Sequence, residues 1–198
     1  MKDSARIEAW EIDDRISSGV ATAAYYQKLH NEVDVYKTNN WLVDHIDKLI
    51  SCQPETLVEV GSGNCKFLRK AAKHVGRVIG LDWAFSPEAI NLPSNVTFLK
   101  RDITLDPIPA GHMICSADVL EHIRPNHIPM VLRKLDSAAP LNYHVIACYD
   151  DRHSHLSIMS PNDWLNQFRL LSQRYEIVDI SFRRNDQSAV VCVISNFP

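Results

Sequence analysis

The sequence TLVEVGSGNCKFLRKAAKHV, residues 56–75, decides the fold of this chain. Residues 56–60 form a short apolar run that predicts a buried strand, and residues 65–75 have the apolar spacing of an amphipathic helix. Between them, Gly61 and Gly63 lack Cβ atoms, so the backbone can turn tightly and a ligand can touch it. We expect the first N–H groups of the helix to face an anionic part of that ligand. The stretch therefore predicts a strand, a ligand-binding loop and a helix in direct succession.

The same alternation of strand and helix continues toward the C-terminus. Further strands are predicted at 77–82, 96–102, 113–118 and 143–150, further helices at 127–139 and 163–171, and a closing pair of strands at 175–184 and 188–197. Ser160 and Pro161 supply an N-cap and a first helical residue for the last helix. The closing pair is expected to form a hairpin that places one antiparallel strand at the edge of the sheet. We therefore predict an α/β fold with a Rossmann-like, doubly wound, seven-stranded sheet, mostly parallel, and helices on both faces.

The N-terminal segment has a different character, and we expect it to form a helical cap. Residues 1–54 would be this cap and residues 55–198 the core of a single domain, with cap helices over 17–30 and 38–50. The segment gathers aromatic rings with polar tips, imidazoles and amides: Tyr25, Tyr26, His30, Tyr36, Asn39, Asn40 and Trp41. Two interpretations stay open, a gate over a bound molecule and ordinary packing of helices on the sheet.

Composition limits the class of protein and its partners. The chain has 198 residues, of which 45% are hydrophobic and 23% charged, which is ordinary for a folded globular domain. A formal net charge of −3 disfavours nucleic acid as a partner. Five cysteines without a C-x-x-C pair indicate free thiols and a cytoplasmic location, and we expect neither a secretory signal nor a membrane span. The pair Arg183-Arg184 is expected to lie in solvent.

Two residues around the glycine loop, Lys66 and Glu59, discriminate between cofactors, and a third, Asp82, has a role that both cofactor classes share. A dinucleotide-binding loop has a third glycine where this chain has Lys66, which disfavours a nicotinamide oxidoreductase. Glu59 precedes the loop and can accept a charge-assisted hydrogen bond from a cationic amino-acid group, which S-adenosylmethionine carries. Asp82 ends the next predicted strand, 21 residues after Gly61, where a carboxylate can accept both ribose hydroxyls. The predicted cofactor contacts are Glu59, Gly61, Ser62, Gly63, Asp82, Trp83 (along the adenosine), Asp102 (at the adenine amino group), Ile103 (backbone N–H on an adenine nitrogen) and Asp118.

Four segments, in order and spacing, resemble the successive motifs of the class I S-adenosylmethionine-dependent methyltransferases. They are VEVGSGNCKFL, VIGLDW, LKRDI and SADVLEHI, and the resemblance covers about residues 55–150. It implies S-adenosylmethionine as the cofactor and an enzyme that methylates oxygen or nitrogen of a small-molecule or glycan-type acceptor. A cofactor-binding module without catalytic activity is an alternative.

Two polar clusters follow the fourth and fifth predicted strands and are expected to share one crevice, because the carboxyl ends of parallel strands meet at one edge. The clusters are DVLEH, residues 118–122, and DDRHSH, residues 150–155. In one interpretation, Glu121 and His122 cap the next helix and shape the pocket. In a second, His122, His153 or His155 is a general base.

In a third interpretation of these clusters, Glu121, His122 and His155, with Asp118, bind a divalent ion. Their spacing resembles E-x-x-E-H…H in small-RNA 3′-terminal 2′-O-methyltransferases, and part of it recurs in ubiquinone-pathway O-methyltransferases. This chain differs from the RNA enzymes by Asp118 in place of Glu and by a short gap between the histidines. We predict the three histidines as catalytic residues without a metal, and a metal-dependent RNA methyltransferase as the alternative.

Overall fold

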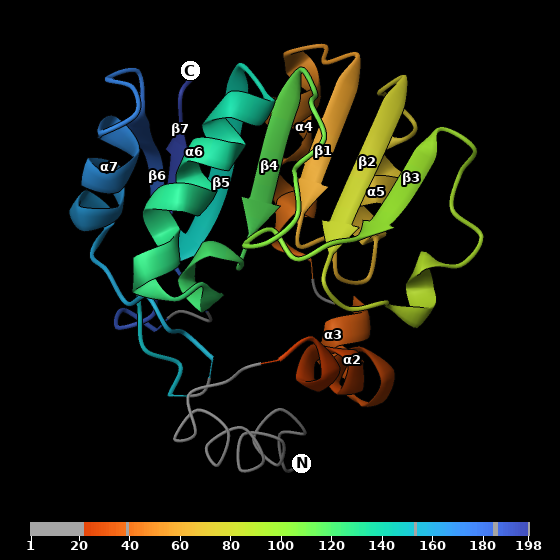
Figure 1. Cartoon of the computed structure of the whole chain (residues 1–198), viewed down its shortest axis with the longest axis horizontal. Coiled ribbons are helices and arrows are strands. Elements are labelled where there is room, and N and C mark those ends of the chain that lie inside the picture. Colours follow the sequence, from red (N-terminus) through yellow and green to blue (C-terminus); the bar gives the residue numbers. More distant parts are fainter. Residues whose placement is uncertain (1–21, 39, 153, 184–185, 198) are drawn as a thin grey trace.

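The computed structural model describes residues 22–38, 40–152, 154–183 and 186–197. Its centre is one seven-stranded sheet in the order β3-β2-β1-β4-β5-β7-β6 (Figure 1). The strands are β1 (Thr56–Val60), β2 (Arg77–Asp82), β3 (Val96–Lys100), β4 (Met113–Ala117), β5 (Leu141–Ala147), β6 (Glu176–Phe182) and β7 (Val190–Ser195). The strand order reverses between β1 and β4, and ligands of doubly wound sheets bind at such a switch point.

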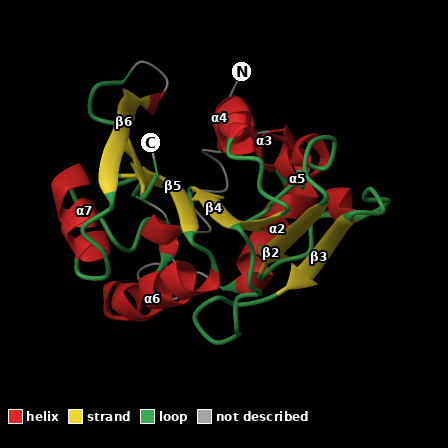
Figure 2. Cartoon of the chain, turned by 90° about the horizontal axis from the view of Figure 1, so that it is seen from above, coloured by secondary structure: helices red, strands yellow, loops and turns green. Residues whose placement is uncertain are grey.

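Helices cover both faces of the sheet, as predicted. They are α2 (Ala23–Glu32), α3 (Asp34–Thr38), α4 (Ile46–Ser51), α5 (Lys66–Ala71), α6 (Ile128–Ala138) and α7 (Pro161–Arg169). Helices α4 and α5 cover one face of the sheet and α6 and α7 the other (Figures 1 and 2), and their apolar side chains belong to two separate core clusters. No helix in the described part of the chain combines the length and the apolar character needed to cross a membrane.

Alternation along the strands divides the core into two layers. Val58 and Val60 of β1 belong to the cluster with α6 and α7, whereas Leu57 belongs to the cluster with α4 and α5. Successive side chains of a strand point to opposite faces, so a run such as TLVEV supplies both layers. Glu59 points to the same face as Leu57 by this alternation, yet its side chain is buried without belonging to either apolar cluster.

The C-terminal hairpin supplies one antiparallel strand, as predicted, but the expected position of that strand was wrong. The antiparallel strand is β7, which pairs with β5 on one side and with β6 on the other, so β6 forms the edge. Burial explains this order. Strand β7 is almost wholly buried, as suits an inner strand, whereas most of the side chains of β6 are exposed, as suits an edge.

Several element boundaries also differ from the expected ones. Strand β3 ends at Lys100 and β4 at Ala117, so Asp102 and Asp118 lie in the loops after their strands. The expected helix over 38–50 begins as a 3₁₀ turn at Trp41–His45 and becomes α-helical only in α4. The helix at Ser160 is confirmed with a full capping box, in which the Ser160 hydroxyl accepts from the Asp163 N–H. The part of the expected cap before residue 22 lies outside the described residues.

The cap helices α2 and α3 lie at the carboxyl ends of the strands (Figure 1). Gln27 of α2 hydrogen-bonds to both backbone groups of Phe85 in the loop after β2. The Tyr36 carbonyl of α3 accepts a hydrogen bond of 3.0 Å from the Asn64 amide, and the Thr38 carbonyl accepts one from Lys66. Contacts with the residues that follow β1 and β2 therefore hold the cap over this edge of the sheet.

A buried histidine gives the folded state a defined dependence on pH. His144 of β5 is fully buried, with Nδ1 2.9 Å from the Ser116 hydroxyl and its ring stacked on Phe168. Burial lowers the pKa of His144 to about 3. The unfolded chain takes up a proton near pH 6.5 whereas the folded chain does not, so this contribution to stability is complete above that pH and is lost as the pH falls toward 3.

We expect His144→Gln to be less sensitive to acid than the native chain. Between pH 6.5 and 5 the native chain should lose about 2 kcal/mol of unfolding free energy through this residue, a loss that the variant avoids. Urea unfolding of both chains at the two pH values measures the difference. Parallel loss of stability in the two chains would contradict the assignment.

Candidate functional site

The carboxyl ends of the strands open into one large cavity of about 1230 Å³. Its walls come from the cap, from the glycine loop after β1, from the ends of β2 and β4, and from the loops after β3 and β5. Typical small-molecule pockets hold about 300–1,000 Å³, so this cavity has room for two molecules side by side.

The glycine loop adopts the backbone conformation for which its glycines were predicted. Gly61 and Gly63 have φ angles of +72° and +48°, in the left-handed region that favours glycine. The Gly61 and Ser62 N–H groups donate to the Leu81 carbonyl, at 2.8 and 3.0 Å. The loop is thus anchored to the end of β2. The expected open N–H groups at the start of α5 are not all available, because the Lys66 N–H donates to the Asn64 side chain.

Glu59 lies beneath this loop and is 1% exposed. Its Oε2 has no hydrogen-bond partner in the described structure. Burial raises the pKa of Glu59 well above its usual value, an effect that a hydrogen bond from Asn40 of the cap opposes and that the nearby Asp82 carboxyl reinforces. A buried carboxyl oxygen without a partner costs about 1–3 kcal/mol, which a bound cationic group would offset.

Asp82 and the cap form the next part of the cavity wall. The Asp82 carboxylate accepts hydrogen bonds from the Gly63 N–H at 2.8 Å and from the Ala84 N–H at 3.0 Å. Burial raises the pKa of Asp82, and these N–H groups and the nearby His30 oppose the rise. Trp83 packs against Tyr26 of α2, with ring centroids 5.2 Å apart.

Residues after β3 line the cavity farther along. Asp102 uses Oδ1 to accept hydrogen bonds from the Thr104 N–H and hydroxyl, so its carboxylate has a fixed orientation. Ile103 is buried, and its carbonyl accepts a hydrogen bond from Lys134 of α6. The structure thus brings the predicted cofactor contacts to one cavity wall, with the exception of Ser62, which is buried behind the loop.

Arg183 lies in this wall, and the expectation that it is solvated was wrong. It is 9% exposed; its Nη2 lies 2.6 Å from Asp118 Oδ1 and its guanidinium lies 3.4 Å from the centroid of the Trp41 ring. Asp118 has a φ angle of +52°, and burial raises its pKa while Arg183 opposes the rise. The guanidinium therefore joins the hairpin, the end of β4 and the cap. Arg184 lies outside the described residues.

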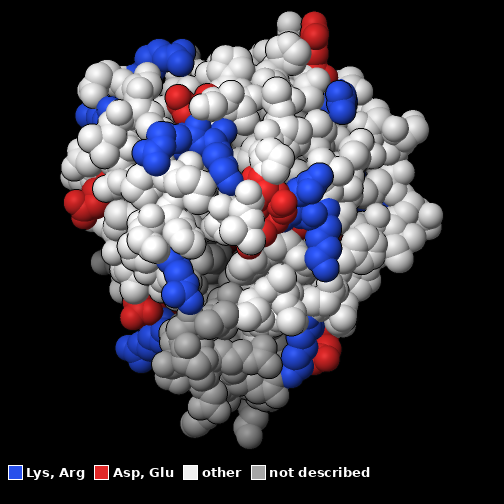
Figure 3. Space-filling model, viewed as in Figure 1, with Lys and Arg blue, Asp and Glu red and all other residues white. Residues whose placement is uncertain are grey.

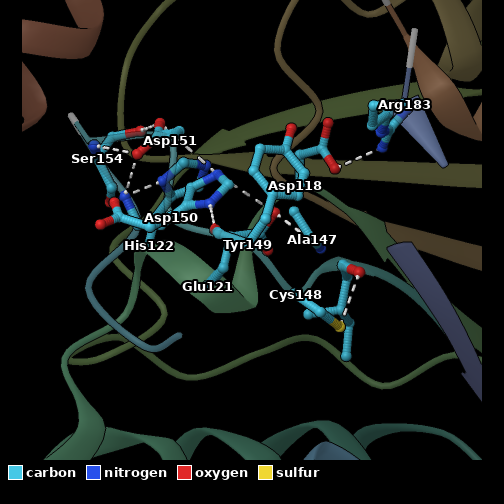
Figure 4. A network of polar contacts seen from close by, with 12 residues as sticks. Asp118, Glu121, His122, Ala147, Cys148, Tyr149, Asp150, Asp151, Ser154 and Arg183 are labelled. Carbon is cyan, nitrogen blue, oxygen red and sulfur yellow. Dashed lines mark hydrogen bonds and ion pairs between the residues drawn. The ribbon is translucent and has the colours of Figure 1, made fainter. Parts of the chain in front are cut away.

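Beyond Asp118, the two predicted polar clusters meet (Figure 4). Glu121, His122 and His155 each offer one ligand atom, and these atoms lie within 4.8 Å of one another. The His122 and His155 rings are 5.0 Å apart. Burial lowers the pKa of His122 to about 4, so this ring is neutral at pH 7. Burial also raises the pKa of Glu121 well above its usual value.

The helix-capping role proposed for this cluster is not observed. The N-cap residue of the next helix, α6, makes no side-chain capping hydrogen bond, and neither do those of the 3₁₀ turns at Leu120–His122 and Pro125–His127. Instead, Glu121 Oε1 accepts a hydrogen bond from the Ala147 N–H at the end of β5, because the turn after β4 directs this side chain beneath the sheet edge. His153, the third predicted catalytic residue, and Asn39 lie outside the described residues.

Sequence reasoning named His30 among the residues of a possible gate but missed Arg183 as a residue of the site. His30 of α2 is buried in the cavity wall, with its ring beside Gly63 and an edge-to-face contact with Tyr36. Burial lowers the pKa of His30, and Asp82 opposes this. Arg183, described above, lies in the wall of the same cavity. Neither residue belongs to a local sequence motif. The only sequence signal for a role in the site is that α2 and the turn after β6 both lie near the carboxyl ends of the parallel strands.

Comparison with known proteins places this geometry in a fold group. The amino-acid sequence matches no protein-family model and no curated protein. Solved structures are similar to it, among them the 1,6-didemethyltoxoflavin-N1-methyltransferase of Burkholderia thailandensis with bound 1,6-didemethyltoxoflavin and S-adenosylhomocysteine (TM-score 0.64, 13% identity, 98% of this chain and 90% of that chain). The N-methyltransferase NodS of Bradyrhizobium japonicum WM9 in complex with S-adenosylhomocysteine has a TM-score of 0.60 at 15% identity, over 87% of this chain and 98% of that chain. A DhpI-SAM-HEP complex has a TM-score of 0.61 at 15% identity, over 88% of this chain and 95% of that chain.

Gly61 has no room for a side chain, and this gives a prediction. A Cβ at Gly61 would lie 2.2 Å from Val119 Cγ2, whereas a Cβ at Gly63 would meet nothing closer than His30 at 3.7 Å. We expect Gly61→Ala to lower the unfolding free energy by about 2–4 kcal/mol and Gly63→Ala by about 1–2 kcal/mol, since both have positive φ but only the first overlaps a neighbour.

Urea unfolding of the two variants measures this difference. The double variant Gly61→Ala, Val119→Ala should regain part of the loss, because it removes the overlapping methyl group. Equal destabilisation by the two glycine substitutions, with no gain in the double variant, would show that the overlap is not the cause.

Proposed function

We propose that this chain, which has the fold of the S-adenosylmethionine-dependent methyltransferases, binds S-adenosylmethionine and transfers a methyl group to oxygen or nitrogen of a small molecule. The observation that carries the proposal is the Glu59 carboxyl, buried under the glycine loop with one oxygen lacking a partner. The cofactor would bring a cationic amino group to that oxygen.

The residues present fit this cofactor along its length. Glu59 would accept from the amino group, Asp82 would accept from the ribose hydroxyls with the lone pairs that Gly63 and Ala84 leave open, and Trp83 would lie along the adenosine. Asp102 and the Ile103 N–H would face the adenine. The positive φ angles of the loop bring its backbone close to the ligand at a point where a side chain would fill the space.

S-adenosylmethionine supplies an activated methyl group, so the protein mainly orients the acceptor and removes its proton. His122 and His155 line the cavity beyond Asp118, beside Tyr26 and Tyr149. A general base works best with a pKa near the working pH. Because burial lowers the pKa of His122 to about 4, His122 is a weak base. Its neutral ring is better suited to accepting a hydrogen bond or binding a metal ion than to removing a proton.

Several observations support a small acceptor rather than a nucleic acid. Among the described residues on the face seen in Figure 3, basic and acidic side chains are interspersed and form no extended basic track. Nucleic-acid binding needs such a track to neutralise phosphates. Two of the similar structures are named as N-methyltransferases, and one of them holds a small heterocyclic molecule. The free state of all five cysteines accords with the proposed cytoplasmic location.

Calorimetry with S-adenosylhomocysteine tests the proposal, because this product keeps the amino group and both ribose hydroxyls. We expect Glu59→Gln to weaken binding by about 10- to 100-fold, since a hydrogen bond between charged groups contributes about 1.5–3 kcal/mol. Asp82→Asn should weaken binding to a similar extent. The exposed Glu88→Gln is the matched control and should bind as the native chain does.

Two outcomes would contradict the proposal. The native chain could fail to bind either form of the cofactor, or Glu59→Gln could bind as tightly as Glu88→Gln. Binding of S-adenosylhomocysteine without methyl transfer to any acceptor would instead favour the alternative, a cofactor-binding module without catalytic activity.

A further inference from the structure

The cluster of Glu121, His122 and His155 has the arrangement of a cation site. The first two residues lie in the 3₁₀ turn after β4, and His155 lies in the loop after β5. One ligand atom from each falls within 4.8 Å of the other two. Glu121 is 0% exposed, and its Oε2 has no hydrogen-bond partner in the described structure. A buried carboxylate oxygen without a hydrogen-bond partner, next to two imidazoles, is a donor set that suits a divalent cation.

Hydrogen bonds fix which ring nitrogen each histidine presents. His122 Nδ1 lies 3.0 Å from the Ser154 carbonyl, and His155 Nδ1 contacts the Tyr149 carbonyl. A carbonyl oxygen can only accept, so each Nδ1 carries a proton, and Nε2 is the ring nitrogen through which each histidine would bind an ion. Metal-bound histidines almost always donate their other N–H in this way, which sets both the tautomer and the ring orientation.

Hydrogen bonds join the backbone of the loop after β4 to that of the loop after β5 around these side chains. The Glu121 carbonyl accepts hydrogen bonds from the Leu156 and Ser157 N–H groups, at 2.8 and 2.9 Å. The Ser157 hydroxyl donates to the Ile123 carbonyl, and Glu121 Oε1 is fixed by the Ala147 N–H. The three ligands are therefore positioned by contacts that do not depend on an ion.

Neighbouring carboxylates are engaged elsewhere, so the set is limited to three ligands. Asp118 Oδ1 is paired with Arg183. Asp151 lies 3.7 Å from His155 Nε2, but it accepts hydrogen bonds from the N–H groups of Ser154 and His155 and from the Ser154 hydroxyl. Three protein ligands leave coordination positions open toward the cavity that the two histidines line.

We propose that Glu121, His122 and His155 bind one first-row divalent cation, and that an oxygen atom of the acceptor fills its open position. Two imidazoles and one carboxylate suit ions such as Mn²⁺, Co²⁺ and Zn²⁺ better than Mg²⁺ or Ca²⁺, which prefer oxygen ligands alone. A cation here would hold a hydroxyl-bearing acceptor and make its hydroxyl more acidic. The second half of the proposal rests on the proposed methyltransferase function, and it favours oxygen over nitrogen as the methylated atom.

Titration of the full, chelator-treated chain with Co²⁺ tests the site, with Mn²⁺ and Zn²⁺ as further probes. We expect one Co²⁺ per chain, with visible absorption bands of a site containing nitrogen ligands. Glu121→Gln, His122→Gln and His155→Gln should each weaken binding by more than about 100-fold, because loss of even an outer partner of a metal ligand costs 10- to 100-fold. His127→Gln, a cavity histidine outside the cluster, is the matched control and should bind Co²⁺ as the native chain does.

Thermal unfolding without metal shows whether each variant is folded, and the cation should raise the midpoint of the native chain and of His127→Gln only. The site is overturned if the native chain takes up none of the three ions, or if the cluster variants bind them as tightly as His127→Gln. Calorimetry with S-adenosylhomocysteine separates the two proposals. If the native chain binds the cation but not S-adenosylhomocysteine, the metal site stands and the proposed methyltransferase function is contradicted. If it binds S-adenosylhomocysteine but no cation, only the metal site is contradicted.

Discussion

A carboxyl group buried without a full set of partners is the constraint on which this structure depends. Glu59 is the last residue of the central strand β1 on the face toward α4 and α5, where burial disfavours its charge and leaves Oε2 without a hydrogen-bond partner. The surrounding fold serves to hold this group in place, because the sheet buries it, the glycine loop closes over it and Asn40 of the cap donates to it. Such a group lowers stability by about 1–3 kcal/mol, a cost that the proposed cofactor would offset by bringing a cationic group to the base of the cavity.

The cavity has two ends that are built differently. The end under the glycine loop is lined by loop backbone and by two carboxyl groups, Glu59 and Asp82, the second of which is oriented by backbone N–H groups. The other end is formed by side chains from segments far apart in the sequence, among them Trp41, Asp118, His155 and Arg183. A backbone-lined end suits a ligand common to many enzymes, whereas a side-chain-lined end suits an acceptor particular to this chain.

The sequence predicted the strands and the glycine loop well because those features depend on local periodicity and on residues without Cβ atoms. It could not predict the order of β6 and β7, since both strands fit a hairpin and only their burial against β5 decides which is inside. Arg183 was misassigned for a related reason. A charged pair in sequence resembles a solvated surface, and the two partners that bury this one, Trp41 and Asp118, lie 142 and 65 residues away. The histidine cluster was found, but its tautomers depend on backbone carbonyls that no motif encodes.

A crystal structure of the full chain with S-adenosylhomocysteine would show whether Glu59 and Asp82 hold this ligand. We expect the amino group of the ligand within hydrogen-bond distance of Glu59 Oε2 and the ribose hydroxyls on the Asp82 carboxylate. A ligand bound elsewhere in the cavity, with Glu59 still lacking a partner, would contradict this expectation.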